Sequence, residues 1–279
     1  MKNIPLALGS LTLLSFIGVA PATAPTATCD AEPSALSSQR GGDDEEEVPD
    51  KRDDIKELCK KFEGHIKKKG KEDVDAIPVL DKLLQEFPGC GPKDRALIVK
   101  TLGKGFGLSR KENRDGTREN RVPIAAAVCL SKMAPESVKT LIKLCNDKKV
   151  QDDSDVRRRV ILSLGKTEDE SGVDTLLKLI SAKEPKIQGA AIEALGQFGD
   201  VDQKVRKLVC EKLIKLILPI KSTVDSDADD QVTREQYDVI GPPTITTLQK
   251  LTGQNIRNFA EWNKWWNKNK RKDWDEEQD

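Results

Sequence analysis

One apolar pattern, written three times, constrains the fold of this chain more than any other feature. Its copies begin at Leu141, Leu176 and Leu213, which are 35 and 37 residues apart. A second apolar pattern precedes each copy and ends on Leu130, Leu164 and Leu195, spaced by 34 and 31 residues. Two apolar helices per period of this length are typical of a helical solenoid, because stacked neighbours bury faces that one repeat cannot bury alone. The sequence therefore predicts an all-α fold, a right-handed α-solenoid of stacked helix pairs.

Helical periodicity and turn residues divide the chain into segments. We predict less regular helical repeats over 51–120 and regular repeats over 121–218. The regular helix pairs are 121–133 with 136–146, 154–165 with 171–182, and 186–198 with 201–218. The charged stretch from Leu108 to Asn120 is predicted to be a surface loop that stands in place of a partner helix. Pro219 is predicted to end the last pair, because proline breaks helix interiors. A polar linker over 219–237 then leads to a C-terminal helical cap and charged tail over 238–279.

The first 50 residues lack the repeated pattern. After Lys2, the stretch from Ile4 to Ala20 has no charge and is followed by small residues, which predicts a signal peptide over 1–24. A retained membrane anchor is the alternative. Residues 25–50 are predicted to be a disordered acidic spacer, because they contain almost nothing apolar to bury. We therefore expect an exported protein, periplasmic or extracellular, with no stable membrane insertion after cleavage.

The balance of charge and the scarcity of histidine exclude several classes of function. The chain has 47 basic and 47 acidic residues, and they are intermixed, so nucleic acid is not an expected partner. The single histidine, His65, is predicted to be a solvated surface residue, which leaves no histidine triad and no multi-histidine metal site. The run from Asp225 to Asp230 begins like a calcium loop but lacks the glycine and the glutamate that such a loop needs. The sequence predicts no catalytic residue, no metal site and no cofactor.

The six cysteines are predicted to fill space more than to cross-link the chain. Alignment of the repeats places Cys129, Cys145 and Cys210 where other repeats carry small or apolar residues, and a free thiol packs well in such positions. Cys59 lies on the apolar face of one predicted helix, and Cys90 lies just beyond the end of the next, antiparallel helix. A disulfide between these two residues is an open alternative.

Aromatic residues gather near the C-terminus. Phe259, Trp262 and Trp266 share one helical face and Trp265 lies beside them, which predicts a Trp-rich helix that caps the exposed end of the stack. One alternative is an aromatic platform that binds a sugar or a peptide. Another is an amphipathic membrane contact that uses neighbouring lysines.

Two segments carry a resemblance to a known family. Asp153–Gly165 and Glu184–Gly196 each begin with an acidic or proline turn and end in Leu-Gly, and they resemble the first helix of HEAT repeats. The similarity is clearest over 121–218. It implies a scaffold whose inner helices form a concave binding face. Some HEAT-like proteins that resemble phycobilisome lyase subunits assist chromophore attachment, which adds an alternative function.

A repeated lysine supplies the candidate binding residues. Lys143, Lys178 and Lys215 occupy one position in the second helix of successive pairs, and stacking would align them as a ridge. Lysines that only keep the repeat soluble are the alternative. We expect a non-catalytic exported scaffold that engages a protein partner through the inner helix face. The alternatives are an accessory subunit of an enzyme or chromophore-lyase system, and an envelope- or carbohydrate-binding module that uses the C-terminal tryptophans.

Overall fold

The computed structural model describes residues 49–107 and 118–275, and all regular structure in these residues is helical. The predicted signal peptide, nearly all of the predicted spacer and Leu108–Thr117 lie outside the described residues. The α-helices are α1 (Asp53–Ile66), α2 (Asp73–Glu86), α3 (Pro92–Lys104), α4 (Arg121–Ser131), α5 (Val138–Cys145), α6 (Lys148–Gln151), α7 (Ser154–Gly165), α8 (Val173–Leu179), α9 (Pro185–Leu195), α10 (Gln203–Ser226), α11 (Gln231–Thr252) and α12 (Phe259–Asn269). The helices of the three predicted regular pairs are present as α4 and α5, α7 and α8, and α9 and α10.

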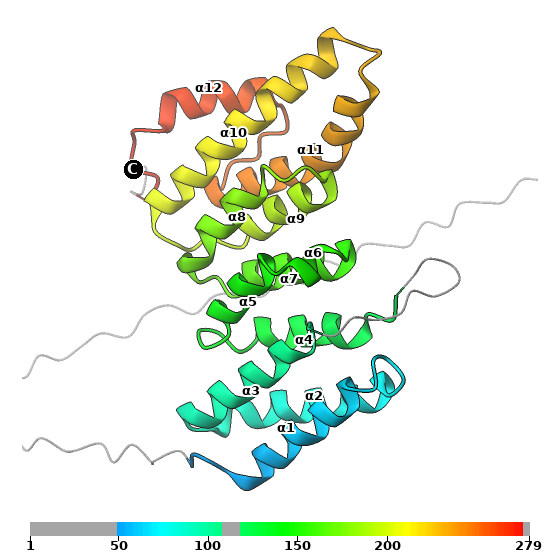
Figure 1. Ribbon diagram of the computed structural model, residues 1–279. Helices are drawn as coiled ribbons and strands as arrows, with labels where there is room; N and C mark the ends of the chain where they lie inside the picture. Colours follow the sequence, from blue (N-terminus) through cyan, green and yellow to red (C-terminus); the bar gives the residue numbers. More distant parts are fainter. Residues whose placement is uncertain (1–48, 108–117, 276–279) are drawn as a thin grey trace, which may run out of the picture. The chain divides into compact units, whose positions relative to one another are not determined.

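The helices of residues 49–275 form two layers (Figure 1). In the first layer, each of α2, α4, α7, α9 and α11 contacts the next member. In the second layer α3 lies beside α5, and α10 lies beside α12, while α1 covers α2 and α3. Helices α5 and α8 each contact the first-layer helix of the following pair, α7 and α9. Consecutive pairs therefore share one continuous core.

The N-terminal helices continue both layers. Helix α2 contacts α4 in the first layer, and α3 contacts α5 in the second. The surface loop predicted from Leu108 to Asn120 lies almost wholly outside the described residues, so it stays a prediction.

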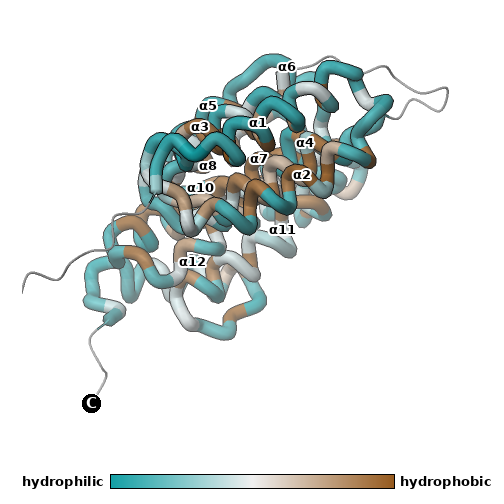
Figure 2. Tube along the Cα trace, turned by 90° about the horizontal axis from the view of Figure 1, so that it is seen from below, coloured by the Kyte–Doolittle hydropathy of each residue, from teal (hydrophilic) through white to brown (hydrophobic). Residues whose placement is uncertain are grey.

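Small residues bring the first-layer helices into close contact. A Cβ atom added to Gly165 of α7 would lie 2.6 Å from the carbonyl oxygen of Ala194 on α9, so only glycine fits at this crossing. Ala191 and Leu195 of α9 are fully buried. The Thr247 hydroxyl of α11 donates to the Ile192 carbonyl at 2.8 Å. In Figure 2 the hydrophobic segments gather toward the middle of the two layers, where these helices meet.

The polar linker predicted over 219–237 is mostly helical, which corrects the sequence reading. Helix α10 runs through Pro219 to Ser226, and α11 begins at Gln231. Proline removes one backbone donor, but the extension is held because α10 and α11 pack along each other. Lys221 of α10 lies 5.8 Å from the centre of the Tyr237 ring of α11, and the Thr223 hydroxyl donates to the Pro219 carbonyl at 3.2 Å. Tertiary packing here outweighs the local signal of the proline.

The predicted closing helices are present as the second part of α11 and as α12. Helix α11 continues through Pro242 and Pro243 and ends at Gly253, whose φ of 70° is in the left-handed region that favours glycine. Within residues 49–107 and 118–275, no helix has both the length and the apolar character needed to cross a bilayer.

Candidate functional site

The three lysines predicted to form a ridge all lie in second-layer helices. Lys143 is on α5, Lys178 on α8 and Lys215 on α10, and all three are exposed. The Lys215 ammonium donates to the Glu211 carboxylate one turn away, and this hydrogen bond lowers the pKa of that carboxyl group. Among the described residues, no acidic side chain pairs with Lys143 or Lys178. The exposure is confirmed, whereas alignment as a ridge stays a prediction.

The C-terminal aromatic residues are mostly buried. Phe259 is 4 % exposed, Trp262 is fully buried and Trp266 is 8 % exposed, so these three share a buried face of α12 as the sequence predicted. Trp265 is half-buried and packs against Trp274, with 5.3 Å between ring centres and 50° between ring planes. A sugar- or peptide-binding platform needs exposed ring faces, and these rings do not supply them. The packing supports a cap, and the cap stays a prediction.

Trp274 completes this cluster, and the sequence analysis missed it. Its indole nitrogen donates to the Asn269 carbonyl at 3.0 Å, and the Lys207 ammonium lies 5.3 Å from its ring centre. The Arg206 guanidinium lies 6.0 Å from the same ring. The tail after α12 thus folds back on the start of α10. The sequence signal for this packing was a lone tryptophan in a charged tail, because a large aromatic residue in such a tail is usually buried against the fold.

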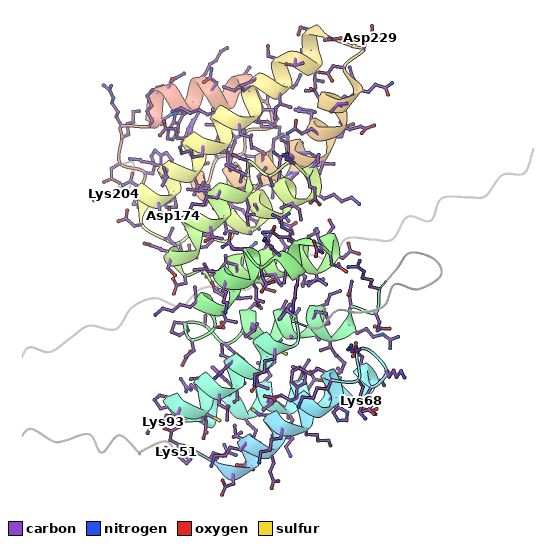
Figure 3. All side chains as sticks on the ribbon, in the orientation of Figure 1. Lys51, Lys68, Lys93, Asp174, Lys204 and Asp229 are labelled. Atoms are coloured by element: carbon purple, nitrogen blue, oxygen red, sulfur yellow. The ribbon has the colours of Figure 1, made fainter. Side chains whose placement is uncertain are left out.

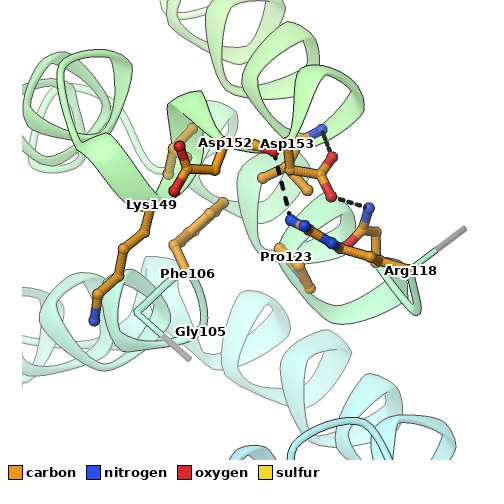
Figure 4. A pocket seen from close by; sticks show the side chains of 10 residues that line it. Gly105, Phe106, Arg118, Pro123, Lys149, Asp152 and Asp153 are labelled. Atoms are coloured by element: carbon orange, nitrogen blue, oxygen red, sulfur yellow. Dashed lines mark hydrogen bonds between the residues drawn. The ribbon is translucent and has the colours of Figure 1, made fainter. Parts of the chain in front are cut away.

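A pocket of about 460 Å³ lies between α4 and α7, beside the end of the segment that precedes α4 (Figure 4). Asp153 accepts a bond from the Val156 amide at 3.1 Å and another from the Asn120 side chain at 2.8 Å. Arg118 donates to the Asp152 carbonyl at 3.4 Å. These polar groups cap α7 and hold residues 118–120 against it. The contacts of these side chains are those of a helix cap, which is a structural role.

The described cysteines are free, buried thiols. No disulfide joins Cys59 to Cys90, so that alternative is wrong. Cys129, Cys145 and Cys210 are buried as predicted. Burial raises the pKa of Cys129 to about 11 and the pKa of both Cys145 and Cys210 to about 12, because a thiolate is poorly solvated in an apolar core. Such thiols are neutral at pH 7 and are poor nucleophiles and metal ligands.

His65 differs from its prediction. It is half-buried rather than solvated, and its Nδ1 lies 3.0 Å from the Glu72 carboxylate. Its Nε2 atom is buried without a hydrogen-bond partner, so a substrate in solvent cannot reach that nitrogen. The pair ties the end of α1 to the start of α2. Over the described residues, no group of three or more histidine, cysteine or acidic side chains is arranged to hold a metal ion.

The stacked helix pairs define a class of protein, the helical-repeat scaffolds, which bind partners on extended surfaces. The comparison with protein families narrows this class: residues 149–217 match a model of HEAT repeats. Residues 149–217 therefore carry HEAT repeats, as the resemblance implied. No curated protein matches the sequence.

Proposed function

We propose that this chain is a non-catalytic, exported scaffold that binds an acidic protein partner along its second-layer helices. HEAT repeats are interaction scaffolds, and the observation that carries the choice of face is the exposure of Lys143, Lys178 and Lys215 at one repeated position of α5, α8 and α10. Successive packed helices lie roughly 10 Å apart, so three ammonium groups on successive repeats would lie along an extended partner. The right-handed turn of the stack and the capping role of α12 belong to the same proposal.

Export is the second part of the proposal, and it depends on the uncharged N-terminal stretch that ends in small residues. Protein recovered from the native source should begin between about Thr23 and Asp30 when its N-terminus is sequenced. An intact Met1 on protein from the envelope or the medium contradicts this part and leaves the scaffold proposal in place.

The binding face is tested by charge reversal on purified protein. The triple variant Lys143→Glu, Lys178→Glu, Lys215→Glu should weaken binding to the partner recovered by co-purification, with the largest loss at low salt, because exposed charges act through screened attraction. Folding should be nearly unchanged, since exposed ion pairs contribute little to stability.

A matched control reverses three exposed lysines of first-layer helices: Lys82→Glu on α2, Lys186→Glu on α9 and Lys250→Glu on α11. Both triple variants change the net charge equally, so general repulsion acts on both. Equal affinities for the two variants would show that the second-layer lysines only keep the repeat soluble.

A further inference from the structure

A groove of about 660 Å³ lies between α10 and α12, at the C-terminal end of the second layer. Helix α10 contributes a stripe at three- or four-residue spacing, which places its side chains on one face. The residues that line the groove from α10 are Lys204, Lys207, Leu208, Glu211, Ile214, Lys215 and Leu218. From α12 and the turn after it come Asn263, Trp266, Asn267, Lys270 and Arg271. Figure 3 labels Lys204 at the start of α10, beside the returning C-terminal tail.

The groove carries an excess of positive charge although the chain as a whole has none. Five of its lining side chains are cationic and one, Glu211, is acidic. Lys215 pairs with Glu211, and the Lys207 ammonium donates to the Lys272 carbonyl. Within the part of the chain that the structure describes, no acidic side chain pairs with Lys204, Lys270 or Arg271. An excess of cationic over acidic side chains raises the potential of the groove and attracts anionic groups.

The floor of the groove is apolar. Leu208 is 38 % exposed, which makes it one of the few large hydrophobic residues that the described chain presents to solvent. Leu218 is half-buried, and Ile214 and Trp266 close the floor beneath them. An apolar strip between cationic rims is the arrangement that binds a ligand with both carboxylates and apolar side chains.

We propose that this groove binds an extended acidic segment of a partner protein, whose carboxylates face Lys204, Lys270 and Arg271 and whose apolar side chains cover Leu208 and Leu218. Nucleic acid fits less well, because stacking of bases needs an exposed ring and Trp266 is 8 % exposed. A flat bilayer fits less well, because the apolar residues lie on a floor between two helices. Binding in this groove can be measured separately, because Lys143 and Lys178 do not line it.

The probe is a fluorescein-labelled peptide of alternating glutamate and leucine, titrated with the purified full chain and followed by anisotropy. Binding should be saturable and should weaken strongly between about 0.1 M and 1 M salt, as the screening length falls from about 10 Å to about 3 Å. A peptide with glutamine for glutamate should bind more weakly because it lacks the negative charge. A peptide with serine for leucine should bind more weakly because it lacks the apolar side chains.

Two variants and a control locate the site. Lys204→Glu with Lys270→Glu should weaken peptide binding by about tenfold or more. Leu208→Ser should weaken it without changing its salt dependence, because only apolar contact is lost. The control, Lys82→Glu with Lys139→Glu, reverses two exposed lysines outside the groove and should bind the peptide almost as wild type does.

Equal losses of peptide affinity in the groove variant and in the control would overturn the proposal. Equal affinity for the glutamine peptide and the glutamate peptide would also overturn it. Tighter capture by phosphatidylglycerol vesicles or by duplex DNA than by the acidic peptide would also overturn it. Lys143 and Lys178 lie outside the groove, so reversing these two without Lys215 tests the proposed function apart from the groove, and a failure of one proposal is distinguishable from a failure of the other.

Discussion

Two contacts in this molecule bring helices together by opposite means. Between α7 and α9 the contact depends on small residues, since a Cβ on Gly165 would lie 2.6 Å from the Ala194 carbonyl oxygen. Between α10 and α12 it depends on large ones, with Trp262 fully buried and Trp266 nearly so. A close backbone approach tolerates no added atom, whereas a contact filled by indoles loses most when a ring is removed. The contact in the middle of the stack therefore depends on residues that cannot be made larger, and the contact at its end depends on rings that cannot be made smaller.

The largest expected effect comes from a charge in the middle of the stack. Ala191→Asp places an unpaired carboxylate at a fully buried position of α9 and should lower the free energy of unfolding by about 3–5 kcal/mol. Urea unfolding followed by circular dichroism measures the change. The matched control is Ala96→Asp on the exposed surface of α3, which should cost less than about 1 kcal/mol. Similar midpoints for the two variants would mean that α7 and α9 are not closely packed.

Removing a ring at the end of the stack tests the other contact. Trp262→Ala should cost about 3 kcal/mol, and because α12 contacts the rest mainly through α10, the loss should detach α12 before the middle unfolds. Hydrogen exchange should show faster exchange in α12 and unchanged protection in α7 and α9. Trp265→Ala is the control, since its half-buried ring contributes less area. Uniform loss of protection along the chain would contradict an independent end.

A single methyl group tests the close approach of α7 and α9 at a finer scale. Gly165→Ala should destabilise by about 1–3 kcal/mol, because its Cβ meets backbone that must shift. Gly64→Ala on α1 is the matched control, since its Cβ would have no neighbour within 4 Å. That control should stabilise by about 0.5–1 kcal/mol, as alanine favours a helix over glycine. If both changes stabilise, the α7–α9 approach is looser than described.

The last expected effect is a pH dependence of stability that comes from two buried thiols, one in each of the second-layer helices α5 and α10. Cys145 in α5 and Cys210 in α10 both have a pKa raised to about 12 by burial. The folded state then holds its thiol proton more tightly than the unfolded state, whose thiol titrates near 8.5. The stabilisation is complete below about pH 8.5 and is lost as the pH rises above it, by about 1.4 kcal/mol per pH unit for each thiol.

Replacement of either cysteine should flatten this slope by the same amount. Urea unfolding between pH 8.5 and 10 measures the slope for wild type, for Cys145→Ala and for Cys210→Ala. A slope that is unchanged in one variant would show that water reaches the thiol in that region. The core around α5 and the core around α10 would then differ in how well they exclude solvent.

The repeated patterns predicted the middle of the molecule more accurately than its ends. Helix α7 spans Ser154–Gly165 as expected, because Asp153 caps it and Gly165 ends it, and both signals are local. The stretch from Pro219 onward was misread, because its helical form depends on packing between α10 and α11 that no local pattern reports.

The candidate sites divide in the same way. Repeat alignment identified Lys143, Lys178 and Lys215 as exposed, since equivalent positions share an environment. The basic groove escaped it, because Lys204 and Lys270 come from helices far apart in the sequence and only the fold brings them together. The stripe of apolar and charged residues along one face of α10 was the signal that could have indicated half of that groove.

The order of helix contacts has a consequence for how the protein is made. Each helix packs against helices that lie close to it along the chain, and none of the main contacts joins the N-terminal repeats to α12. A chain that leaves the ribosome at about 5–20 residues per second can therefore bury its earlier helices while the later ones are still being synthesised. The last apolar edge, on α10, stays uncovered until α12 has emerged, so that interval is when the nascent chain is most exposed to aggregation.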